Sequence, residues 1–131
     1  MKLEIVFPHP PHVLSANARL PRDSAAAGKL NGAKIGAKMK TRDAARASAA
    51  AALAGIMQDR FPARVMSVEW YYKRGVKPDV DGVVTRMKPL LDGCALAFGI
   101  NDRDIELGSV RRIRDLENGG TVKLIFDTEE Q

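Results

Sequence analysis

The fold is decided by the stretch from Lys77 to Ile105, which reads KPDVDGVVTRMKPLLDGCALAFGINDRDI. Two aspartates, Asp79 and Asp81, precede an apolar helical run, and a third, Asp102, follows it in a polar turn. Divalent cations such as Mg²⁺ take oxygen ligands, usually carboxylates together with waters and substrate phosphate. Alternate residues of an extended segment point the same way, so Asp79 and Asp81 can converge on one ion. If the helix brings Asp102 back to them, the stretch predicts a metal site with these three ligands.

Each acidic group also has a structural explanation. Aspartate is a common N-cap and turn former, so Asp81 can simply cap the helix that follows it. The order of the parts favours the metal site, because the acid pair, a helix with Lys88 and a second acidic turn follow one another. Lys88 would add positive charge at the transition state of phosphodiester cleavage. It can also pair with Asp92, four residues later on the same helix face.

At these residues the chain resembles the RusA family of Holliday-junction resolvases. The resemblance lies in DVDGV at 79–83, KPLLD at 88–92 and NDRDI at 101–105, and in FPHPP at 7–11, at the end of the first predicted strand. It implies a RusA-like α+β fold and a homodimer that resolves four-way DNA junctions in recombination and repair. It also implies Asp79, Asp81, Asp102 and Lys88 as catalytic residues. The three aspartates would hold one or two Mg²⁺ ions, with Mn²⁺ as a substitute.

Two positions depart from the family pattern. Gly82 stands where the family usually has Asn, and about three extra residues separate Asp81 from Lys88. In one continuous helix, Asp81 and Lys88 share a face, since an offset of seven residues at about 100° each nearly completes two turns. Alternatively, residues 81–87 form a separate turn and the helix starts at Lys88, with Pro89 at its first position. We expect Lys88, rather than Thr85 or Arg86, to be the catalytic cation.

Composition is consistent with a DNA-binding protein. The chain has 131 residues, which predicts one domain over residues 1–131, and a net charge of +5 suits a polyanionic partner. Cys94 is the one cysteine, so no intrachain disulfide forms, and its apolar surroundings predict an inert buried thiol. No segment has the length and apolarity of a membrane span, and no signal peptide is recognisable, so we expect a cytoplasmic protein that contacts no membrane.

The segments before Lys77 predict two strands and a helix. Lys2–Phe7 alternates as a strand, and His9 and His12 follow in a proline-rich loop, either as solvated side chains or as a two-histidine metal site. Asn17–Lys40 is basic and glycine-rich, which fits a solvated loop or an arm that orders on DNA. Thr41–Asp59 is predicted to be a helix with Asp43 in its first turn.

Arg42 and Arg46 lie four apart in that predicted helix, where they can grip a phosphate or simply face solvent. The second strand is predicted at Val65–Lys73. It carries Trp70, which we assign to the core, and Glu69, which can lean toward the acids.

The remaining segments complete the sheet. Leu90–Phe98 is predicted to be helical with Gly99 as its C-cap, and Ile105–Arg114 to be a strand with an irregularity at Gly108–Ser109 and a basic rim. A hairpin turn at 115–120 would lead to a strand at Val122–Phe126, followed by a frayed tail over 127–131. The order β–α–β–α–β–β predicts an α+β domain with one mixed sheet and two packed helices.

Three functions fit these residues. The first is a Mg²⁺-dependent endonuclease that acts on branched DNA, chiefly four-way junctions. A flap or general structure-selective nuclease would use the same acids, because their spacing carries no information on the branch type. A non-catalytic DNA-binding module would use the basic residues alone, with the acids as caps and turn formers.

Overall fold

The computed structural model describes residues 1–14, 24–56 and 60–129. Its elements follow the order β–α–β–α–β–β, which confirms the predicted α+β fold. The strands are β1 (Lys2–Pro8), β2 (Val65–Tyr72), β3 (Glu106–Arg114) and β4 (Thr121–Asp127), and the helices are α1 (Ser24–Ala54) and α2 (Val80–Phe98). Two single-turn helices, η1 (His12–Leu14) and η2 (Asp102–Asp104), precede α1 and follow α2.

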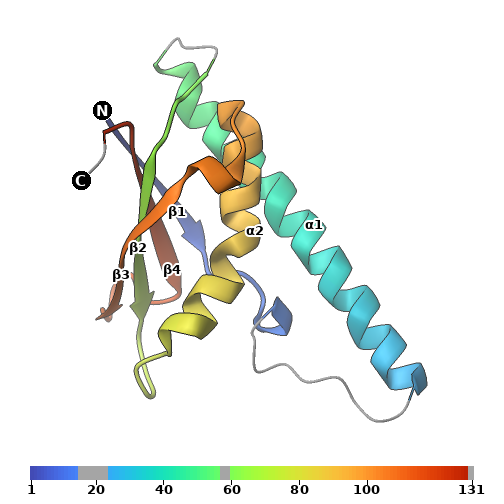
Figure 1. The fold of residues 1–131 in the computed structure, drawn as a ribbon. Coiled ribbons are helices and arrows are strands. Elements are labelled where there is room, and N and C mark those ends of the chain that lie inside the picture. The colour runs from blue at the N-terminus through green and yellow to red at the C-terminus, as the bar shows by residue number, and fades with distance from the viewer. Residues whose placement is uncertain (15–23, 57–59, 130–131) are drawn as a thin grey trace.

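The four strands form one mixed sheet in the order β1-β4-β2-β3. β2 and β3 are parallel, and α2 is the crossover that joins them, as parallel neighbours require. β4 pairs antiparallel with both β1 and β2. Both helices pack on one face of the sheet (Figure 1). The core between the layers includes Met66, Val68, Trp70, Met87, Cys94, Phe98, Val122, Leu124 and Phe126.

The hairpin predicted at residues 115–120 is wrong. β3 and β4 are consecutive in the chain, but β2 lies between them in the sheet. The connection therefore passes across the end of β2, where the Asp115 amide donates to the Tyr72 carbonyl and the Gly120 amide to the Tyr71 carbonyl. A side chain at Gly119 would lie 2.8 Å from the Lys73 nitrogen, so the crossing needs glycine there.

The end of the chain also differs from the prediction. Asp127 belongs to β4 rather than to a frayed tail, and it is buried. Its carboxylate lies 3.8 Å from the amino group of Met1, and this ion pair joins the ends of the paired strands β1 and β4.

The loop predicted over residues 17–40 is wrong from Ser24 onward, because those residues belong to α1. Residues 17–23 lie outside the part of the chain that the structure describes. Asp43 consequently sits in the middle of α1 instead of its first turn. Gly28, Gly32 and Gly36 explain the error, since each costs a helix interior about 1 kcal/mol relative to alanine and weakens the helical signal. The amino-terminal part of α1 extends past the sheet (Figure 1).

Helix α2 is continuous from Val80 to Phe98 and contains Pro89, so the separate-turn alternative is wrong. Its N-cap is Asp79 and not Asp81. Gly99 takes the left-handed conformation at φ 71° and closes the helix, as predicted. The irregularity at Gly108–Ser109 is confirmed as a bulge, because the β2–β3 register shifts there.

The two helices touch where Gly93 of α2 meets Ala45 of α1. An added Cβ at Gly93 would lie 2.2 Å from the Arg42 carbonyl oxygen and 2.8 Å from the Ala45 Cβ, so only glycine allows this approach. Ala45 and Ala49 are fully buried beside the contact. From this crossing the helices diverge toward the amino-terminal ends of both (Figure 1).

Candidate nucleic-acid groove and acidic centre

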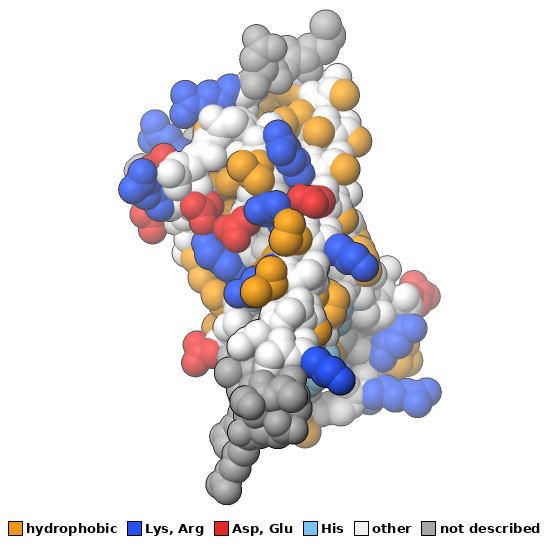
Figure 2. Space-filling model, turned by 90° about the vertical axis from the view of Figure 1, so that its right-hand side faces the viewer, with side chains coloured by type: hydrophobic (Ala, Val, Ile, Leu, Met, Phe, Trp, Pro, Cys, Tyr) orange, Lys and Arg blue, Asp and Glu red, His pale blue; other side chains and the backbone are white. Residues whose placement is uncertain are grey.

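The diverging helices enclose a groove of about 610 Å³. Its floor is apolar and includes Leu14 of η1 together with Val84 and Pro89 of α2. Figure 2 looks onto the side of the molecule where α1 lies, and there basic side chains are spread over the surface while acidic ones gather in the upper part. The groove is lined by Leu14, Lys34, Lys38, Met39, Arg42, Val84, Thr85, Lys88, Pro89 and Asp92.

The α1 side of the groove is cationic. Lys34, Lys38 and Arg42 recur every four residues, so they share one helix face, and all three line the groove. The sequence contained this signal, but the pattern is meaningful only if residues 34–42 are helical. Arg42 contacts Asp43 at 3.4 Å, and its Nε is buried with no hydrogen-bond partner among the described residues.

At the inner end of the groove, Lys88 stands between two carboxylates. Its Nζ lies 2.6 Å from Asp102 Oδ2 and 3.4 Å from Asp92 Oδ1. Asp102 is presented by η2, where the Asn101 side chain caps the turn by accepting a hydrogen bond from the Arg103 amide at 3.1 Å. The structure therefore unites Lys88 with Asp102, and it also forms the Lys88–Asp92 pair that the four-residue spacing allowed.

In this trio, Lys88 and the two carboxylates affect one another's pKa values. The hydrogen bond with Lys88 is the main reason that the pKa of Asp102 is lowered, and the same bond raises the pKa of Lys88. Burial raises the pKa of Asp92, although the Lys88 ammonium opposes this. Asp92 also borders a second hollow of about 330 Å³, which Arg42 and Asp102 line as well. A carboxylate pair with an ammonium group between its members thus lies where the two hollows meet.

Asp79 and Asp81 do not join this trio. Because α2 begins at Val80, the two side chains are about 200° apart around the helix instead of parallel, as an extended segment would make them. Asp81 shares the face of Lys88 but precedes it by about two turns. Asp79 lines a separate pocket with Trp70 and Arg86. Within the described chain, no three histidine, cysteine, aspartate or glutamate side chains are grouped closely enough to hold a metal ion.

The residues therefore fit a divalent ion only in part. The set Asp79, Asp81 and Asp102 does not form one site in this structure. Asp92 and Asp102 flank the same ammonium group, and two carboxylates with waters are the usual protein ligands of Mg²⁺.

Behind the groove, a stack of rings fixes the amino-terminal half of α2. His9 lies on Trp70 with ring centroids 3.8 Å apart, and the Arg86 guanidinium lies 5.1 Å from the Trp70 ring. Arg86 also donates to the Pro10 carbonyl, so it is engaged in structure. His9 Nε2 lies 2.9 Å from the Thr121 carbonyl oxygen. The expectation of a solvated His9 is wrong, whereas His12 is exposed.

Three other predicted residues have defined places. Trp70 is in the core, as predicted. Glu69 points to the opposite face of the sheet, where it accepts a hydrogen bond from the Tyr71 hydroxyl at 2.9 Å, so it does not lean toward the acids. Cys94 is buried, as predicted, and burial raises the pKa of its thiol to about 12, which is consistent with the predicted inert residue.

Arg112, assigned to a basic rim, instead donates to the Pro78 carbonyl at 3.0 Å and fixes the start of α2.

Comparisons of the chain with protein-family models, with curated proteins and with solved structures gave no match. The resemblance to the RusA family therefore stays a prediction. Among the described helices, none combines the length and apolarity that crossing a membrane requires.

Proposed function

We propose that this protein is a Mg²⁺-dependent endonuclease that acts on branched DNA. The observation that supports the proposal is the Lys88–Asp102 pair, 2.6 Å apart, at the inner end of a groove whose α1 wall is cationic. Cations along a groove concentrate a polyanion in it, and carboxylates at its end supply the ligands for a divalent ion. Two carboxylates repel the phosphates of bound DNA. They are therefore not expected on a surface that only binds DNA.

Each residue of the trio has a role that its geometry supports. Asp102 and Asp92 would hold the ion, which when bound supplies charge stabilisation and an activated water. Lys88 contacts both carboxylates, so with an ion held by them its ammonium would be available to a phosphate oxygen. The pKa of Asp102 is lowered from an ordinary value already well below neutral pH, so its carboxylate is ionised and can bind a cation. Lys88 stays protonated because its pKa is raised.

Four-way junctions are the specific substrate that we propose, and a homodimer is the active unit. Both follow from the resemblance to the RusA family and from the two-fold symmetry of a junction, which needs two matched cuts. A flap or general structure-selective nuclease remains the second candidate, because the same groove and acids serve it equally.

The test is a nicking assay on junction, flap and linear duplex substrates, with and without Mg²⁺. We expect Mg²⁺-dependent cleavage that is fastest on the junction. Asp102→Asn and Lys88→Ala should each slow cleavage by about a hundredfold or more, as loss of one charge at the transition state does. Asp104→Asn is the matched control, because Asp104 lies in the same turn η2 and is exposed.

The same assay separates the acids. Asp92→Asn should slow cleavage as Asp102→Asn does. Asp79 lies in a different pocket, so Asp79→Asn should keep most of the activity. Near-normal nicking by both Asp102→Asn and Lys88→Ala would remove the proposed function. A loss in Asp79→Asn and Asp81→Asn equal to that in Asp102→Asn would instead restore the three-aspartate site.

A further inference from the structure

A row of cations on α1 faces one cation on α2 across the groove. The row consists of Lys34, Lys38 and Arg42, and Lys88 stands opposite. We infer that these four residues form a phosphate track, which admits one unpaired DNA strand and leads it to the Lys88–Asp102 pair. The inference rests on the proposed function and specifies the form of DNA that its site accepts.

The spacing of the row suits the backbone of one strand. Residues four apart on a helix are separated by about 6 Å along its axis, so the row is about 12 Å long. A strand wound in a duplex has a phosphate about every 3.4 Å along the axis, and an unpaired strand can extend further per nucleotide, so the row lies beside at most about four phosphates.

The width of the groove selects an unpaired strand. α1 and α2 are in contact at Gly93 and Ala45, and packed helices at such a contact have axes only about 8–10 Å apart. The groove closes at this contact and holds about 610 Å³, the volume of a drug-sized ligand, so a nucleotide or two of one strand can enter and a duplex cannot. A strand that has left its complement at a branch point can enter.

The floor of the groove supports the same conclusion. Leu14, Val84 and Pro89 present apolar surface between the charged walls. Sugar rings and unstacked bases have apolar faces that can lie on such a floor, whereas the outside of a duplex offers mainly phosphates.

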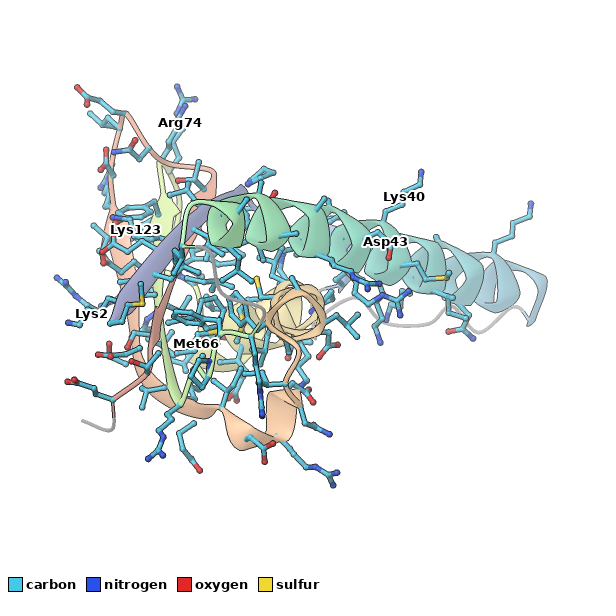
Figure 3. The ribbon with its side chains drawn as sticks, turned by 90° about the horizontal axis from the view of Figure 1, so that it is seen from above. Lys2, Lys40, Asp43, Met66, Arg74 and Lys123 are labelled. Atoms are coloured by element: carbon cyan, nitrogen blue, oxygen red, sulfur yellow. The ribbon has the colours of Figure 1, made fainter. Side chains whose placement is uncertain are left out.

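Lys40 provides a matched control within α1. It is two residues past Lys38, on the other side of the helix, and Figure 3 shows its side chain pointing away from α2. Lys38→Gln and Lys40→Gln therefore remove the same charge from the same helix, but only the first change touches the track. Circular dichroism should show equal helicity for the two variants.

The experiment measures binding by fluorescence anisotropy in EDTA, so that no cleavage occurs, over a series of salt concentrations. The probes are a single strand, a blunt duplex and a four-way junction. We expect Lys34→Gln and Lys38→Gln to weaken binding of the single strand. Each should also flatten its log–log salt slope by about 0.7 for every phosphate that the variant no longer neutralises. Lys40→Gln should match the wild type.

Two outcomes would overturn the inference. One is an unchanged salt slope in Lys34→Gln and Lys38→Gln, and the other is a loss on blunt duplex as large as that on the single strand. If either occurs while the wild type still nicks DNA in Mg²⁺, the phosphate track is refuted and the proposed function is not. A wild type that neither binds nor nicks any of the three probes would refute the function itself.

Discussion

The helix crossing at Gly93 gives the most direct test of the structure. In Gly93→Ala, the new Cβ would lie 2.2 Å from the Arg42 carbonyl oxygen and 2.9 Å from the Arg46 nitrogen. Both are backbone atoms, so no side-chain rotation relieves the clash. The helices would have to separate by roughly 1 Å to restore ordinary contact at 3.4 Å, and overpacking of this kind costs about 1–3 kcal/mol.

Helix propensity acts in the opposite direction. Alanine in a helix interior is about 1 kcal/mol better than glycine, which offsets part of the clash. Because the contact is with backbone, we expect the upper end of the overpacking range and a net loss of about 2 kcal/mol in the free energy of unfolding. With a slope of 1–3 kcal/mol per molar urea, the unfolding midpoint should fall by about 1 M.

Gly32→Ala is the control for this measurement. Gly32 lies inside α1, and an added Cβ meets nothing within 4 Å, so only the propensity gain remains. We expect Gly32→Ala to raise the free energy of unfolding by up to about 1 kcal/mol. The assay is urea unfolding followed by circular dichroism. If Gly93→Ala proves as stable as Gly32→Ala, the close crossing is refuted, and with it the narrow inner end of the groove.

Two further predictions concern half-buried His9 and buried Cys94. Burial lowers the pKa of His9 from 6.5, so the stability that its neutral form contributes is fully present above that value and is lost as the pH falls toward the folded-state pKa. The urea midpoint of the wild type should therefore drop more between about pH 7 and pH 5 than that of His9→Gln, and equal drops would contradict the half-buried stacking of His9 on Trp70. The Cys94 thiol, with its pKa raised to about 12, should resist iodoacetamide in the native protein and react once urea unfolds it, whereas rapid native labelling would show that the α2 core opens.

Local sequence patterns predicted the order of the elements and several of their details. Alternation located the strands, and the glycine at position 99 marked the end of α2. The bulge at Gly108–Ser109 was also visible as an interruption of the apolar pattern. These features depend on neighbours within a few residues, which is the range over which dihedral preference and side-chain periodicity act. The burial of Trp70 and Cys94 follows from the same patterns, because apolar runs face the core.

The amino-terminal half of α1 shows where local signals fail. Its glycines and lysines are typical of a loop, yet Ser24–Ala54 is one helix whose carboxy-terminal half packs on α2. Helix stability in proteins comes mostly from tertiary packing rather than propensity, so a weak segment can continue a helix that is anchored elsewhere. The cation row on α1 could be recognised only once this continuation was known.

The candidate site was decided by tertiary structure. The sequence alone identified Lys88 and Asp102, but it could not show that Lys88 contacts both Asp92 and Asp102, since the η2 turn must first fold back along α2. The sequence also could not show that the side chains of Asp79 and Asp81 point in different directions. That separation depends on the helix starting at Val80, because one residue more in extended conformation would have kept the two carboxylates parallel. Residues distant in sequence meet only through the packing of α1, α2 and the sheet, and no periodicity within one segment encodes that packing.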